Sequence, residues 1–202
     1  MEAGKWYQVG SPFVALDDTK TPKLNDVFTT GFSDGDQMSI FNSTTQRYVV
    51  YDWSSAEKAW GINDDWDGFI KTDVTLTIGQ GVFINKKSNG NVVLSGKVST
   101  SEAVAFGDEK GNSWTQITYS CPIETKLNTL TWTNLADGDQ INVFDPATQR
   151  YTAYDWSSAS NGWGINDDWD GFVLKDVPLA VGQAVFINKK STGVGFCTFP
   201  QK

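Results

Sequence analysis

Histidine is missing from this sequence of 202 residues, and cysteine and methionine each occur only twice. Without histidine the chain cannot form a Ser-His-Asp triad, a Cys-His pair or a typical zinc site. These absences exclude most of the common hydrolase mechanisms.

Positive charge is also scarce, because 16 Lys and Arg stand against 24 Asp and Glu and leave a net charge of -8. Binding to a phosphate backbone requires clustered Lys and Arg that displace counterions. We therefore expect no nucleic-acid partner.

Long apolar runs are absent as well, and none approaches the roughly 18 residues that cross a bilayer. The first six residues lack the basic and apolar regions of a signal peptide, which fits a cytosolic chain or a mature secreted one. We expect no insertion into a membrane.

The main positive feature is an internal repeat. A shift of 103 positions aligns residues 35–90 with residues 138–193 without a gap, and 37 of the 56 pairs are identical. Upstream, the segment Trp6-Tyr7-Gln8 corresponds to Trp114-Thr115-Gln116, and Lys23-Leu24-Asn25 corresponds to Lys126-Leu127-Asn128. We predict two tandem homologous modules, at residues 1–100 and 107–202.

Short strand-like segments fill each module. Residues 37–41 alternate, residues 48–53 are β-branched and aromatic, and residues 82–84 form a short apolar run. Residues 42–46 predict a hairpin loop, and no stretch sustains a helical period with caps. The sequence predicts an all-β fold in which each module is a small antiparallel β-sandwich or barrel.

Several motifs recur in the same order in both modules: W-x-Q, L-N, a Gly-Asp-Gln strand, a Tyr-rich strand and G-Q-x-V-F-I-N at residues 79–85 and 182–188. This order resembles a recurring β-module of large bacterial secreted and surface proteins. The resemblance implies an extracellular or cell-surface location. No activity is attached to that module, and its pattern does not include the Trp- and Asp-rich part of this chain.

That part, here called the Trp/Asp segment, reads YDWSSAEKAWGINDDWDGF at residues 51–69 and YDWSSASNGWGINDDWDGF at residues 154–172, with three differences in nineteen positions. Flanking apolar positions have diverged more, for example Val50 against Ala153. Since polar loops ordinarily vary faster than cores, the segment either has a function or is a folded scaffold whose Asp and Asn residues satisfy backbone donors in turns.

Exposed aromatic rings beside carboxylates and amides are what a sugar-binding surface requires. On a strand, Val49, Tyr51 and Trp53 share one side, and Thr152 replaces Val49 in the second module. Because that position accepts a polar residue, we expect Tyr51 and Trp53 to be partly exposed. The predicted ligand-binding residues are Tyr51, Asp52, Trp53, Trp60, Asn63, Asp64 and Trp66, with Tyr154, Asp155, Trp156, Trp163, Asn166, Asp167 and Trp169 in the second module. Trp60 and Trp66 fit a hydrophobic core equally well.

A second chemistry overlaps the first, because N-x-D-x-D-G matches the opening of a calcium loop. The predicted metal ligands are Asn63, Asp65 and Asp67, with Asn166, Asp168 and Asp170 in the second module. The glutamate that would complete an EF-hand is missing, because Val74 and Val177 stand at the twelfth position. Calcium is therefore the one cofactor that the sequence indicates.

The sequence favours a non-catalytic, lectin-like protein over an enzyme. Paired carboxylates such as Asp64 and Asp67 occur in glycoside hydrolases, but modules this small cannot enclose a deep cleft. We expect an extracellular or cell-surface protein whose partner is a glycan or a surface protein. The alternative is a structural or adhesin-type repeat in which the Trp/Asp segment stabilises the fold or docks a protein.

The two cysteines, Cys121 and Cys197, fall in the same module at positions that correspond to the apolar residues Phe13 and Leu94. They either form a disulfide, as an oxidising compartment would allow, or remain two buried thiols.

Overall fold

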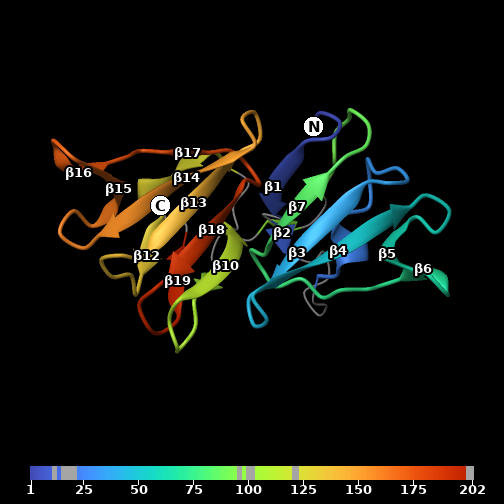
Figure 1. Ribbon diagram of the computed structural model, residues 1–202, viewed down its shortest axis with the longest axis horizontal. Helices are drawn as coiled ribbons and strands as arrows, with labels where there is room; N and C mark the ends of the chain where they lie inside the picture. The colour runs from blue at the N-terminus through green and yellow to red at the C-terminus, as the bar shows by residue number, and fades with distance from the viewer. Residues whose placement is uncertain (11–12, 15–21, 95–96, 99–102, 120–122, 199–202) are drawn as a thin grey trace.

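The computed structural model describes residues 1–10, 13–14, 22–94, 97–98, 103–119 and 123–198, and these residues form an almost purely antiparallel β-structure (Figure 1). Two six-stranded sheets dominate it. The all-β prediction is confirmed, and no helix interrupts residues 35–90.

The first sheet has the strand order β1-β7-β3-β4-β5-β6. Its strands are β1 (Trp6–Gly10), β7 (Gly81–Asn85), β3 (Gln37–Asn42), β4 (Arg47–Ser54), β5 (Ala59–Asp64) and β6 (Gly68–Lys71). The second sheet has the order β10-β18-β13-β14-β15-β16. Its strands are β10 (Ser113–Thr118), β18 (Ala184–Lys189), β13 (Gln140–Asp145), β14 (Arg150–Ser157), β15 (Gly162–Asp167) and β16 (Gly171–Leu174). The repeat in the sequence therefore corresponds to two sheets of matching strand order.

Short elements complete the described chain. They are β2 (Phe13–Val14) paired with β8 (Lys97–Val98), β11 (Thr125–Lys126) paired with β17 (Pro178–Leu179), a small sheet of β12 (Thr131–Thr133), β19 (Gly195–Thr198) and β9 (Val104–Phe106), the helix α1 (Leu24–Val27) and the 3-10 turn η1 (Leu127–Thr129). Strand β9 precedes residue 107 and pairs with β19. The module boundaries at residues 100 and 107 stay a prediction.

The hairpin between β3 and β4 was expected at residues 42–46 and is present there. The Asn42 side chain accepts hydrogen bonds from the backbone amides of Thr44 and Thr45, at 2.9 and 3.0 Å. Gln46 adopts a positive φ of 56°, which closes the turn. Local side-chain bonding of this kind explains why a polar pentapeptide joins two apolar strands.

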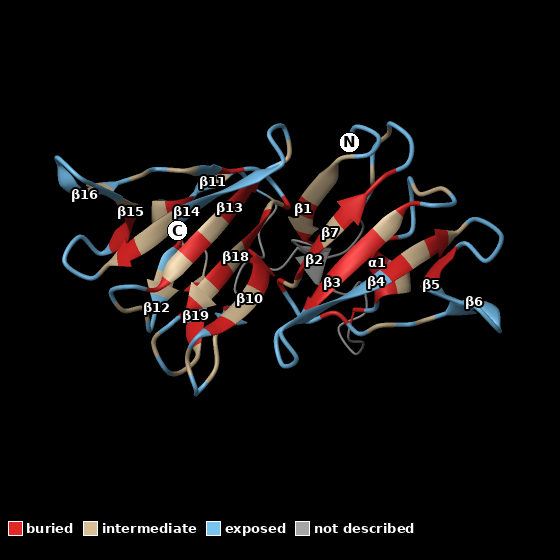
Figure 2. Cartoon of the chain, viewed as in Figure 1, coloured by how far each residue is buried: buried red, intermediate tan, exposed pale blue. Residues whose placement is uncertain are grey.

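Each sheet covers its own core (Figure 2). In the first sheet, the inner sides of β3, β4, β5 and β7 pack on residues 24–28, where Leu24 is fully buried. Asn25 lies beside it and ties this segment to the sheet, since its side chain accepts the Trp60 amide at 2.7 Å and donates to the Thr72 carbonyl at 2.9 Å. The L-N motif of the sequence thus consists of a core leucine followed by an asparagine that hydrogen-bonds to the sheet.

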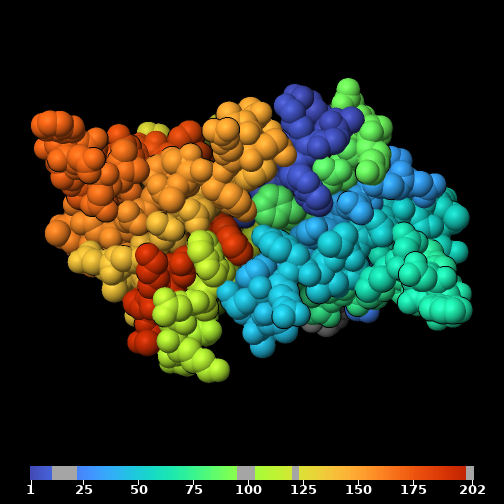
Figure 3. All heavy atoms as spheres, viewed as in Figure 1, coloured from blue at the N-terminus to red at the C-terminus, as the bar shows by residue number. Residues whose placement is uncertain are grey.

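The two sheets contact each other through reciprocal interactions. The Gln46 side chain receives the Trp114 amide and donates to the Trp114 carbonyl, both at 3.1 Å, and Gln149 does the same for Trp6 at 2.9 and 3.0 Å. In Figure 3 the hairpin that carries Gln149, in orange, touches the N-terminal segment, in dark blue. Such an exchange of equivalent contacts is the pattern of an isologous interface.

Candidate functional site

The aromatic residues at the start of the Trp/Asp segment lie in the core. Tyr51 and Trp53 are 6% and 7% exposed, so the expected exposure of these two rings is wrong. Their neighbour Val49, on the same side of β4, is exposed. The change from Val49 to Thr152 in the repeat therefore says nothing about the exposure of Tyr51 and Trp53.

Trp60 is also a core residue, with no exposed surface, and so is Trp163. The Trp60 indole packs edge-on against Trp53 and Phe32, at centroid distances of 5.3 and 4.7 Å, and its N–H donates to the Phe28 carbonyl at 2.8 Å. Of the two interpretations weighed for Trp60, the structure supports the core. Trp156 is buried and Tyr154 is half-buried in the second sheet.

The opposite face of the first sheet carries a row of polar side chains that we call the polar ladder. It consists of Gln37 on β3, Asp52 on β4 and Asn63 on β5. Gln37 pairs directly with Asp52 across the two strands, which places both side chains on one face. The Gln37 amide donates to one Asp52 carboxylate oxygen at 3.1 Å, and the Asn63 amide donates to the other at 2.9 Å.

The second sheet repeats this ladder with Gln140, Asp155 and Asn166. Both of its hydrogen bonds to the Asp155 carboxylate measure 3.1 Å. The ladder is thus present twice with the same donors and acceptors. Gln37 and Gln140 were not among the residues predicted from the sequence, although they are identical in the repeat.

An aromatic ring borders each ladder. Asp52 lies opposite Gly61, and a Cβ atom on Gly61 would come within 2.6 Å of the outer carbon of the Phe69 ring. The ring therefore lies against the strand where the side chain is missing. Phe172 covers Gly164 in the same way, at 2.7 Å. Both phenylalanines are half-buried, so part of each ring faces solvent beside the ladder.

The hairpin between β5 and β6 presents the most exposed tryptophan of the segment. Trp66 is 95% exposed, and so is Trp169 in the second sheet. The Asp64 carboxylate accepts the backbone amides of Trp66 and Asp67, at 2.8 and 3.2 Å. These two hydrogen bonds lower the pKa of Asp64, so Asp64 caps the turn, as Asp residues commonly do.

The predicted calcium ligands lie at this same turn. In the described part of the chain, no group of three or more Asp, Glu, Cys or His residues is arranged to hold a metal ion. The Asn63 amide nitrogen is already bonded to Asp52, while Asp65 and Asp67 are exposed. Asp64, the remaining carboxylate of this loop, accepts hydrogen bonds from backbone amides of the turn. Calcium binding by the loop stays a prediction.

Cys197 is a free thiol in the core around β19, where burial raises its pKa well above the ordinary value. Its proposed partner, Cys121, lies outside the described residues. The structure shows Cys197 as a buried thiol, and the state of Cys121 stays a prediction.

No known protein family, curated protein or solved structure gives a match to this chain. Among the described residues, no helix is long and apolar enough to cross a membrane.

Proposed function

We propose that the protein binds carbohydrate without catalysis, outside the cell or at its surface, through two equivalent sites. Each site is a polar ladder with its bordering phenylalanine. The observation that supports this proposal is the repetition of the ladder, since Gln37, Asp52 and Asn63 and their counterparts keep the same hydrogen bonds on both sheets.

The ladder has the chemistry that sugar hydroxyls require. An ionised carboxylate has about four acceptor positions, and neighbouring amides use two of them at Asp52. The remaining positions are available to hydroxyl groups, and the free acceptor and donor atoms of Gln37 and Asn63 extend the row. The exposed part of the Phe69 ring offers a surface for the apolar face of a pyranose.

Two equivalent sites on one chain allow bivalent binding. Strands β6 and β16, beside which the ladders end, lie at opposite ends of the molecule (Figure 1). A polymeric ligand that reaches both sites would bind with an avidity above that of either site, because the second contact is intramolecular.

A structural or adhesin-type role is the second candidate, and the burial of Trp53 and Trp60 favours it. The two functions use different faces of the same strands. The inner face of β4 and β5 stabilises the core, and the outer face carries Asp52 and Asn63. The exposed Trp66 and Trp169 rings are available to a glycan or to a protein partner.

Removing both ladder carboxylates is expected to abolish retention on glycans. In the double variant Asp52→Ala and Asp155→Ala, each site loses a charged acceptor, and a hydrogen bond to a charged group contributes about 1.5–3 kcal/mol, or at least about tenfold in affinity per site. The measurement is a glycan array followed by titration with the best-retained oligosaccharide.

The matched control is the double variant Asp73→Ala and Asp176→Ala. It removes the same two charges at positions that pair with Lys23 and Lys126 outside the ladder. Retention is expected to match wild type. If the ladder variant also retains the glycan at wild-type affinity, the ladders are not the site.

Calcium is tested on the same protein. Because the two loops have identical sequences from residue 61 to 69 and from 164 to 172, any calcium site is expected to appear twice, and a titration should give two equivalents per chain. Ion binding to the folded state would also raise the melting temperature over that in excess EDTA. Superimposable melts with no heat of binding would leave Asp64 and its neighbours as a turn without an ion.

A further inference from the structure

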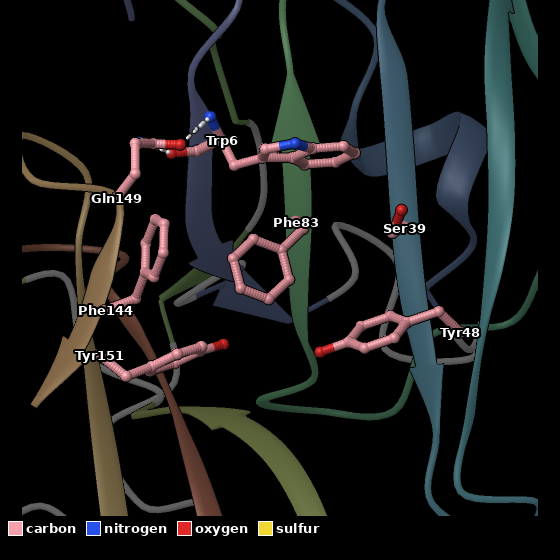
Figure 4. A pocket seen from close by; sticks show the side chains of 7 residues that line it. All are labelled: Trp6, Ser39, Tyr48, Phe83, Phe144, Gln149 and Tyr151. Atoms are coloured by element: carbon pink, nitrogen blue, oxygen red, sulfur yellow. Dashed lines mark hydrogen bonds between the residues drawn. The ribbon is translucent and has the colours of Figure 1, made fainter. Parts of the chain in front are cut away.

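A second kind of site lies where the two sheets meet. An open pocket of about 550 Å³ is formed there by aromatic side chains of both sheets (Figure 4). Its lining residues are Trp6, Ser39, Tyr48 and Phe83 of the first sheet, and Phe144, Gln149 and Tyr151 of the second. This volume is in the range of small-molecule sites, roughly 300–1,000 Å³.

The rings are arranged as a cage around Phe83. Trp6, Phe144 and Tyr151 stand nearly perpendicular to it, at 84°, 87° and 86°, and Tyr48 is inclined at 66°. Their centroids lie between 5.3 and 6.4 Å from that of Phe83. In Figure 4 the Trp6 and Phe144 rings are seen almost edge-on, so their faces border the space in front of Phe83.

The polar groups at the pocket are few and uncharged. Gln149 is occupied by the backbone of Trp6. The hydroxyls of Tyr48 and Tyr151 point toward each other across the space (Figure 4), and burial raises the pKa of Tyr48 to about 12 and that of Tyr151 further, so both remain neutral. An anionic ligand would find no cation in this lining, and a sugar would find few groups for its hydroxyls.

We infer that this pocket binds a quaternary ammonium head group of the choline type. Ring faces carry negative charge density, and a cation within about 6 Å of several ring centroids is attracted to all of them, most strongly to Trp. The five rings line one open pocket, so a cation bound in it would lie beside several ring surfaces. The net charge of -8 adds a field that attracts cations to the whole molecule.

The repeat does not produce this pocket a second time in the same form. At the corresponding position of the second sheet, Trp114 stacks flat on Phe186, with centroids 4.9 Å apart and planes at 24°, whereas Trp6 stands perpendicular to Phe83. Asn142 also replaces the smaller Ser39. We therefore expect one ammonium site per chain, in contrast to two glycan sites.

The test is a calorimetric titration of the full chain with choline and with 3,3-dimethylbutan-1-ol, which has the same shape without the charge. Choline is expected to bind once per chain, and the neutral alcohol roughly threefold or more weakly, as cation–π attraction at a partly exposed site gives. Equal affinity for the two compounds, or no heat with choline at millimolar concentration, would overturn the inference.

Two variants locate the binding. Trp6→Ala removes one wall and keeps the backbone contacts to Gln149, and choline affinity should fall roughly threefold or more. Trp114→Ala is the matched control and should bind as wild type. Ser39→Asn places in the pocket the side chain that the second sheet already accommodates, so it should fold normally and lose choline. Wild-type affinity in Ser39→Asn or Trp6→Ala, or an equal loss in Trp114→Ala, would contradict the site.

The same head group occurs free and on lipids, and a further measurement separates these sources. Sedimentation with phosphatidylcholine vesicles, competed by free choline, would assign the lipid-borne form, whereas choline binding without sedimentation would assign a soluble one. The ladder variant Asp52→Ala and Asp155→Ala should bind choline normally, so a failure of the glycan proposal leaves this site intact.

Discussion

Replacing Trp60 by alanine is expected to lower the free energy of unfolding of the first sheet by about 3–5 kcal/mol. The indole has no exposed surface and packs against Trp53 and Phe32, so its removal leaves a cavity. It also leaves the Phe28 carbonyl without its 2.8 Å hydrogen bond. Urea unfolding followed by circular dichroism measures the loss.

Trp66→Ala is the matched control for this substitution. It removes the same side chain six residues further along the Trp/Asp segment, where the ring is 95% exposed, and its effect on stability is expected to stay within about 0.5 kcal/mol. Equal effects of the two substitutions would contradict the division of the segment into a core part and a surface part.

The sequence predicts which residues of the Trp/Asp segment share a face, but it does not predict which face is buried. Alternation along residues 47–53 correctly separates Tyr51 and Trp53 from Tyr48 and Asp52. Alternation cannot say which of the two faces is covered, because the cover comes from another part of the chain, residues 24–32. The sequence therefore predicts a ligand site that mixes the buried Tyr51, Trp53 and Trp60 with Asp52 and Asn63 of the outer face.

Predicting the polar ladder requires the register between the strands. Gln37 is fifteen residues from Asp52 along the chain, and only the pairing of β3 with β4 brings them into contact. Gly61 and Phe69 carry a signal in the sequence, since both are unchanged in the repeat, but the reason lies in the packing of the ring on the glycine. The aromatic pocket is lined by residues of both sheets. Aligning the repeat with itself does not show how the two sheets contact each other, so the sequence does not predict this pocket.

A buried ion pair underlies the second large effect that we expect. The Lys86 ammonium lies 2.7 Å from the Asp36 carboxylate, and both side chains are almost fully buried. Asp36 also accepts the backbone amides of Lys87 and Ser33, at 2.7 and 2.9 Å. One carboxylate thus joins the turn before β3 to the end of β7.

Asp36→Ala is expected to destabilise the protein by about 3–5 kcal/mol, because it leaves the Lys86 charge buried without its counterion. Adding Lys86→Met to this variant should recover part of the loss, since an apolar side chain of similar length removes the uncompensated charge. Equilibrium urea unfolding of wild type, the two single variants and the double variant forms a double-mutant cycle that measures the coupling.

An exposed pair of the same chemistry provides the control. Lys23 and Asp73 are also 2.7 Å apart, but their side chains are 48% and 42% exposed. Water already solvates both charges there, so Asp73→Ala is expected to cost less than about 1 kcal/mol. Burial rather than distance then decides the energy of a Lys–Asp contact in this fold, and an Asp36→Ala variant no less stable than Asp73→Ala would show that water reaches Lys86 in the folded protein.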